Sequence, residues 1–200
     1  GALDTRINDA GSEYEGITLG KIAKLVDEPQ ATEKEAAAFI IPSTYRAHDG
    51  RNHAAQRENG EYWLLAIDVD EGDPSLTELR SAVERVTFNA SALFYSSSGA
   101  SEANRKWRVL IPLAEPISGE DYVDAQLSLF DLMRAEGITC DPALSRTGQP
   151  IYLPNVPPAR RDEFGMPMMY HGVRHRGDGL LVLRESTIWA NLLFRRKNEE

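Results

Sequence analysis

Hydrophobic and polar positions along this 200-residue chain alternate between a strand-like and a helix-like period. An apolar run at 62–67 opens with aromatic side chains and predicts a strand that is buried on both faces. Shorter apolar runs at 92–95, 107–111 and 151–153 predict three further strands, and Pro112 is expected to end the third strand of the four.

Helical spacing of the apolar positions predicts a helix over 75–86 and a longer one over 119–135. Asp73 and Pro74 are the expected cap and first residue of the former, and Ser118 is the expected cap of the latter. The resulting order, β-α-β-β-α-β, is the ferredoxin-like or RNA-recognition-like (RRM-like) pattern. We therefore expect an α+β fold, with a four-stranded antiparallel sheet and two helices on one face.

The flanking segments carry further elements of secondary structure. We expect helices over 19–26 and from about residue 31 to 39, together with a terminal helix over 187–196. Apolar residues at 168–171 and 180–183 could add two strands. This predicts one domain: an N-terminal helical segment over about 1–60, whose residues 1–18 are a loosely ordered lead-in, an RRM-like core over about 62–154, and a C-terminal extension over about 155–200.

The composition narrows the class of protein. A hydrophobic fraction of 42% with 26% charged residues is typical of a globular domain, and no apolar run reaches membrane-spanning length. The single cysteine excludes an internal disulfide framework, so a reducing, cytoplasmic setting is expected. A net charge of −9 argues against binding nucleic acid over the whole surface, although a local basic groove remains compatible with it.

Candidate chemistry begins where the first strand ends. Asp68 and Asp70 are two residues apart, so on a strand their side chains project to the same side. Adjacent carboxylates repel each other unless a positive group lies between them, and hard oxygen ligands favour Mg²⁺ or Mn²⁺. The alternative is a strand that runs into an acidic, solvated turn.

Two other segments are expected near the same end of the sheet. Asp141, just before the fourth strand, could supply a third carboxylate, or could simply cap a turn ahead of Pro142. Ser96 and Ser98 lie in a small-residue turn that could cradle an anion, and Arg108 on the neighbouring strand can pair with a phosphate. Three aspartates beside such a cradle are suited to two-metal phosphoryl or nucleotidyl transfer.

Other basic residues are candidates for contacts with the phosphates. Arg46, Arg51 and His53 lie on a polar stretch and could form a positively charged wall, although solvent-exposed loop residues would look the same. Lys106 precedes Arg108, and Arg160 and Arg161 follow the predicted core. Such clusters on either side of a carboxylate site are candidates for nucleic-acid contacts, or else are solvated surface.

Together these segments resemble the catalytic domain of the archaeo-eukaryotic primase (AEP) superfamily, in its phage- and plasmid-type primase-polymerase branch. The resemblance covers about residues 40–158 and is carried by three sequence segments. These are Ile67-Asp68-Val69-Asp70, then Phe94-Tyr95-Ser96-Ser97-Ser98 leading to Lys106-Trp107-Arg108-Val109-Leu110-Ile111-Pro112-Leu113, and Asp141 leading to Gln149-Pro150-Ile151-Tyr152-Leu153-Pro154.

The resemblance implies a function and assigns roles to residues. Asp68, Asp70 and Asp141 would be the catalytic metal ligands, with Mg²⁺ or Mn²⁺ as cofactor, nucleoside triphosphates as substrates and a single-stranded DNA template as partner. Ser96, Ser98 and Arg108, with Arg46, Arg51 and His53, would contact the nucleotide, and Lys106, Arg160 and Arg161 the nucleic acid. A helicase domain in a longer parent protein is also implied.

One departure from the family pattern keeps alternatives open. The second motif of the family is typically Ser-x-His, whereas the turn here reads Ser96-Ser97-Ser98-Gly99 and has no histidine. His48, His53 or Arg108 could supply the missing positive charge. The alternatives to an active primase-polymerase are a catalytically weak module that binds single-stranded nucleic acid and a metal-dependent nuclease.

Overall fold

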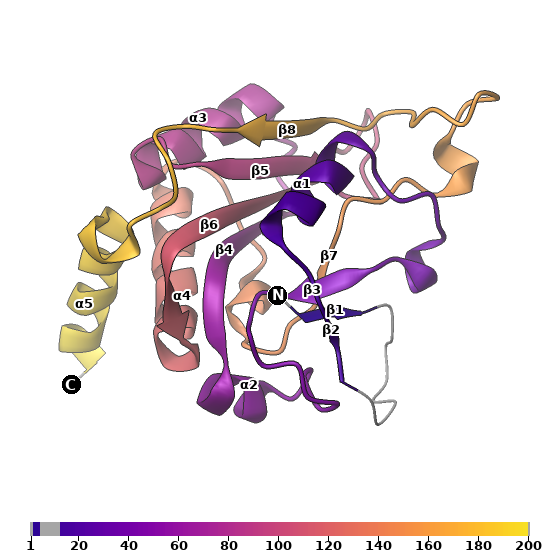
Figure 1. Cartoon of the computed structure of the whole chain (residues 1–200). Helices are drawn as coiled ribbons and strands as arrows, with labels where there is room; N and C mark the ends of the chain where they lie inside the picture. Colours follow the sequence, from indigo (N-terminus) through magenta and orange to yellow (C-terminus); the bar gives the residue numbers. More distant parts are fainter. Residues whose placement is uncertain (1, 5–12, 200) are drawn as a thin grey trace.

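The chain folds into two antiparallel sheets, with helices packed around the larger one (Figure 1). The computed structural model describes residues 2–4 and 13–199. The strands are β1 (Ala2–Asp4), β2 (Glu15–Gly16), β3 (Phe39–Ile41), β4 (Glu61–Val69), β5 (Ala92–Ser96), β6 (Trp107–Ser118), β7 (Ile151–Tyr152) and β8 (Gly172–His175). The α-helices are α1 (Leu19–Asp27), α2 (His53–Asn59), α3 (Leu76–Thr87), α4 (Gly119–Ala135) and α5 (Thr187–Glu199). Single 3₁₀ turns are η1 (Lys34–Ala36), η2 (Pro142–Ser145), η3 (Pro158–Arg160) and η4 (Leu183–Glu185).

The larger sheet has the order β4-β6-β5-β8 and forms the centre of the core. Every residue from 64 to 69 in β4 is buried, which confirms the prediction of a strand covered on both faces. Figure 1 shows α3 and α4 behind this sheet, while α1 crosses its other face against β5 and β8. The predicted α+β fold, with antiparallel strands and two helices on one face, is therefore confirmed.

The fourth strand is not where the β-α-β-β-α-β pattern places it. β7 pairs with β3 in the smaller sheet, whose order is β2-β1-β3-β7, and β8 takes the fourth position in the larger sheet beside β5. As a result β4 is an edge strand, whereas the pattern makes it central. With only two residues, β7 carries too few hydrogen bonds to specify its partner from sequence.

The free edge of β4 is covered by a side chain in place of a strand. Gln126 of α4 is completely buried, and its amide accepts from the backbone N–H of Ala66 and donates to the backbone oxygen of Ala66, both at 2.9 Å. The same amide donates to the backbone oxygen of Leu144 in η2, at 3.2 Å. Exposed strand edges are prone to unwanted pairing, so this glutamine both protects β4 and joins it to η2.

Two predicted boundaries in the core are wrong. The predicted third strand does not end at Pro112, because β6 continues to Ser118. Beyond Leu110, β6 pairs in the sheet only with β4, so a proline there removes no second ladder bond. Helix α3 is capped by Ser75, whose side chain forms a capping box with Glu78, and not by Asp73.

The N-terminal segment mixes helix and strand. Helix α1 confirms the first prediction, but the helix predicted from about 31 to 39 is wrong: only the short turn η1 is helical, and β3 follows. The alanine-rich composition favours a helix locally, but pairing of β3 with β1 and β7 overrides this propensity. Part of the predicted lead-in, residues 1 and 5–12, lies outside the described residues.

The C-terminal extension is only partly as predicted. The predicted strands at 168–171 and 180–183 are wrong, because the strand in this region is β8 and only Leu181 of the second run forms an isolated bridge, with Leu113. Helix α5 is confirmed and is joined to α4 by ion pairs of Arg195 and Arg196 with aspartates of α4. Within the described ranges, no helix has the length and apolar character required to cross a bilayer.

Candidate active site

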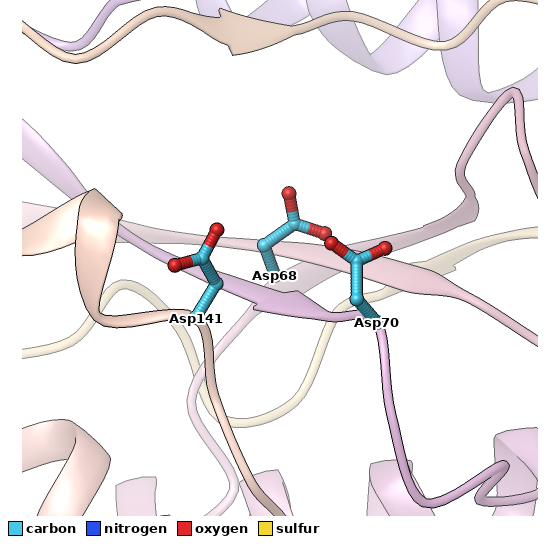
Figure 2. A group of neighbouring side chains, drawn as sticks. All are labelled: Asp68, Asp70 and Asp141. Atoms are coloured by element: carbon cyan, nitrogen blue, oxygen red, sulfur yellow. The ribbon is translucent and has the colours of Figure 1, made fainter.

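Three carboxylates gather where β4 ends. Asp68 lies in β4, Asp70 directly follows it, and Asp141 is the residue before η2. One oxygen from each lies within 4.8 Å of the others, and Figure 2 shows all three side chains pointing to the same side. Asp68 is buried, Asp141 is half-buried and Asp70 is exposed, so the group opens from the core towards the solvent.

Asp141 reaches this group because η2 lies against the free edge of β4. Its backbone N–H donates to the carbonyl oxygen of Asp68 at 2.8 Å, in the direction in which a neighbouring strand would pair. One oxygen of its side chain accepts from the N–H of Ala143 at 2.8 Å, which caps η2. The two interpretations of Asp141 from the sequence, as a cap and as a member of the carboxylate group, are thus compatible in one residue.

Arg108 lies inside the sheet and pairs with the most buried of the three. It faces Asp68 across β4 and β6, and its Nε donates to Asp68 Oδ2 at 3.1 Å. Burial raises the pKa of Asp68. The neighbouring carboxylates of Asp70 and Asp141 raise this pKa further, whereas Arg108 lowers it. Burial works against the charge of Arg108, but Asp68 and Tyr95 hold the pKa of this guanidinium above its usual value.

The carboxylate group suits a divalent cation. The second oxygen of Asp68, Oδ1, is buried and has no hydrogen-bond partner among the described residues. A buried carboxylate oxygen without a hydrogen-bond partner costs free energy, and a bound cation that prefers oxygen ligands would supply the missing partner. Asp68, Asp70 and Asp141 are therefore the residues that could hold Mg²⁺ or Mn²⁺; the contacts do not discriminate between these ions.

A cavity of about 220 Å³, lined by both polar and apolar side chains, lies beside the aspartates. Lys106 connects the two, because it lines the cavity and its Nζ lies 3.1 Å from Asp70 Oδ1. The other residues that line it are Ser96, Ala100, Ser101, Glu102, Arg105, Trp107, Met169 and His171. Arg105 is held by Asp73, which it contacts through both its backbone N–H and its guanidinium.

The structure brings a histidine to the motif that lacks one. The N–H of His171 donates to Ser96 Oγ at 3.0 Å, and the N–H of Ser96 donates to the His171 carbonyl at 2.9 Å. The imidazole ring lies 6.1 Å from the ring of Trp107 and lines the cavity. His171 was missed because it lies 75 residues from Ser96 in sequence, and no motif links the two.

Arg46, Arg51 and His53 lie in other surroundings. Arg46 contacts Gly16 of β2. The backbone of Arg51 approaches Gly148, and His53 Nδ1 accepts from the N–H of Gly148 at 2.9 Å. The contacts of Arg51 and His53 join the start of α2 to the loop that follows η2. None of these contacts of the described residues links Arg46, Arg51 or His53 to the three carboxylates.

Burial and two neighbouring arginines lower the pKa of His53. One of them, Arg146, ends η2 and was missed in the sequence analysis. Arg51 is the other. The positive residues near His53 therefore lie by the loop that follows η2.

The guanidinium groups of Arg160 and Arg161 donate hydrogen bonds to backbone carbonyls. Arg160 Nη1 donates to the carbonyls of Ser98 and Ala100. Arg161 donates to the carbonyls of Val156, Gly165, Pro29 and Gln30. Both arginines hold loops together, and Ser98 contributes its backbone to this arrangement; direct contact of these arginines with nucleic acid stays a prediction.

Comparisons with known proteins support the fold. No family model matches the chain, and no curated protein matches its sequence. Among solved structures, the AEP domain of the primase-polymerase (PrimPol) of cyanophage S-2L is similar, with a TM-score of 0.50 at 13% sequence identity. The match covers 88% of this chain and 77% of the cyanophage domain. At this identity the similarity concerns the fold, so the chain has an AEP-like α+β fold.

Proposed function

We propose that this chain catalyses template-directed nucleotidyl transfer, as the primase-polymerase domain of a DNA replication protein. The observation that carries the proposal is the group of three carboxylates with oxygens within 4.8 Å of one another. It lies at the end of a buried strand, beside a cavity that Arg105 and Lys106 help to line, and in an AEP-like fold. Its substrates would be nucleoside triphosphates and its partner a single-stranded DNA template, with a helicase domain as a further partner in a longer parent protein.

The aspartates are assigned the central role. Asp68, Asp70 and Asp141 would hold Mg²⁺ or Mn²⁺, which when bound neutralises charge on the phosphates and favours ionisation of the attacking hydroxyl. Arg108 is assigned a positioning role, because it fixes one oxygen of Asp68 and so directs the other towards the cation. Lys106, at the junction of aspartates and cavity, would pair with a phosphate when the nucleotide arrives.

His171 is our candidate for the missing motif histidine. Its backbone is bonded on both sides to Ser96, so the ring is held beside the serine although it comes from a distant segment. The ring is accessible and lines the cavity together with Arg105, Lys106 and Glu102. On this proposal His171 would contribute to phosphate binding in the place of the motif histidine.

The test is incorporation of labelled nucleotides on a single-stranded template with Mg²⁺ or Mn²⁺, with and without a primer. Asp68→Asn and Asp141→Asn should each reduce incorporation by about 100-fold or more, because each removes a charged ligand that acts in the transition state. Asp178→Asn is the matched control: it makes the same chemical change in an exposed turn after β8, and should leave incorporation unchanged.

Either result is informative. Incorporation that survives both aspartate substitutions in a folded protein would contradict the proposed chemistry. Synthesis in the reaction without primer would further identify a primase, whereas synthesis only with a primer would indicate a polymerase. His171→Ala should raise the KM for nucleotide more than it lowers kcat, since its proposed contact is with bound phosphate.

A second function is favoured by one specific contact pattern. Asp68 pairs with Arg108 and Asp70 with Lys106, so two of the three carboxylates are already neutralised by protein side chains. A catalytically weak module that binds single-stranded nucleic acid would show the same pattern. It predicts no Mn²⁺ binding by calorimetry and salt-sensitive binding of single strands that persists in Asp68→Asn.

A further inference from the structure

We propose that the hairpin at residues 160–169 binds the bases of the single-stranded template by stacking, with Phe164 as its principal contact. This inference rests on the proposed function, because the single strand it would bind is the template of that reaction. It concerns an interaction surface that is separate from the aspartates and that borders the cavity through Met169.

The hairpin is held in one conformation by its own hydrogen bonds. Arg161 and Pro167 form an antiparallel bridge, and Asp162 N–H donates to the carbonyl of Met166 at 3.0 Å. Within the turn, the Asp162 carboxylate accepts from the N–H groups of Phe164 and Met166, at 3.0 and 2.8 Å. Gly165 has a φ of +77°, a left-handed conformation that glycine adopts without strain.

Two arginines attach the base of the hairpin to the body of the protein. Arg160 donates to the carbonyls of Ser98 and Ala100, in the turn that follows β5. Arg161 donates to the carbonyls of Pro29 and Gln30, in the segment that follows α1, at 2.9 and 3.0 Å. This arrangement fixes where the tip points before any ligand arrives, which reduces the entropy lost on binding.

The tip of the hairpin presents apolar side chains to the solvent. Phe164 is 81% exposed, the highest value among the large apolar side chains of the described residues, and Met166 is 62% exposed. Met168 and Met169, at the base, are 46% and 42% exposed. Contiguous apolar side chains on a rigid projection are typical of a binding surface.

The hairpin borders the proposed active site. Met169 lines the same cavity as Lys106 and His171, and Lys106 in turn contacts Asp70. A path over the surface therefore leads from the exposed apolar tip, past Met169, to Lys106 and then to the carboxylates. A single strand laid along this path would place bases against the tip and phosphates over the cavity.

The charges favour nucleic acid over a protein partner in this orientation. Glu163 at the tip would repel a phosphate, so the tip contacts the strand through base faces, which are uncharged and apolar. The positive groups lie instead in the cavity, where Arg105 and Lys106 form part of the lining together with Glu102. Stacking on an aromatic ring is also tolerant of sequence, as a template contact must be.

The test is binding of the full chain to two fluorescein-labelled oligonucleotides of equal length, one of deoxythymidine and one abasic, measured by anisotropy without nucleotide. Phe164→Ala should weaken binding of the thymidine strand by about fivefold to 100-fold. It should leave binding of the abasic strand unchanged, because that strand keeps the phosphates but lacks base faces. Phe194→Ala in α5 is the matched control, since Phe194 is similarly exposed but lies elsewhere in the fold.

Other outcomes would overturn the inference. Equal affinity of wild type and Phe164→Ala for the thymidine strand, equal weakening on both strands, or no binding by wild type would each exclude stacking by this hairpin. An unaffected strand affinity would leave the apolar tip for a protein partner. The incorporation assay separates the two proposals: an active wild type with unchanged binding in Phe164→Ala retains the proposed function and removes only the role of the hairpin.

Discussion

Replacing Gln126 tests whether one buried amide holds the edge of β4 and the active site together. In Gln126→Leu the backbone N–H and carbonyl of Ala66 lose their partners, both in the interior. A buried backbone group without a partner costs about 1–3 kcal/mol, so two such groups lower the free energy of unfolding by about 2–6 kcal/mol. Leucine has a similar volume, which keeps the contribution from a cavity small.

Urea denaturation followed by circular dichroism measures this loss. With a slope of about 2–3 kcal/mol per molar urea, the midpoint should fall by about 0.7–3 M. Gln149→Leu is the control: Gln149 is only half-buried and lies outside the β4 edge, and its replacement should cost less than about 0.5 kcal/mol. A midpoint within about 0.3 M of wild type for Gln126→Leu would refute the reasoning.

The same substitution should reduce activity in the protein that remains folded. Gln126 also donates to the carbonyl of Leu144 in η2, and η2 positions Asp141 beside Asp68. Loss of this bond loosens the third carboxylate relative to the other two. Incorporation measured well below the unfolding midpoint should therefore fall by more than the folded fraction alone accounts for.

Three further predictions concern single positions. Gly148→Ala should destabilise the protein by about 1–3 kcal/mol, because the new Cβ would lie 2.4 Å from the carbonyl oxygen of Arg51. Burial raises the pKa of Cys140 to about 12, so its thiol should react with Ellman's reagent at pH 8 many times more slowly than in urea. Arg105 lowers the pKa of Asp73 to about 2, so Asp73→Asn should destabilise the protein at pH 7, and this difference should vanish as the pH falls from about 4 to 2.

Each of these has a contradicting result. Thermal unfolding of Gly148→Ala at the wild-type temperature would mean that the loop relaxes without cost. Equal rates of Cys140 modification in native and unfolded protein would contradict its burial. The sign for Asp73 follows from its depressed pKa: the stabilisation is present above the unfolded pKa of about 3.9 and is lost on protonation, so a difference that persisted unchanged at pH 2 would contradict the ion pair.

The sequence alone determined the features that depend on neighbouring residues. The apolar run of β4 and the spacing of Asp68 and Asp70 follow from the strand period, and helices α1, α3, α4 and α5 follow from helical periodicity. These patterns sufficed for the α+β class and for the placement of two of the three carboxylates. They failed at β3, where local helix propensity is overridden by pairing with distant strands.

Only the tertiary structure decided which distant segments meet. Asp141 lies beside Asp68 because Gln126 and η2 occupy the edge of β4 that the expected fourth strand would have covered. His171 lies beside Ser96 because β8 joins β5, leaving β7 to the smaller sheet. A strand edge presents the same backbone groups to every possible partner. Which strand pairs with it therefore depends on the packing of the whole chain and cannot be predicted from a local sequence pattern.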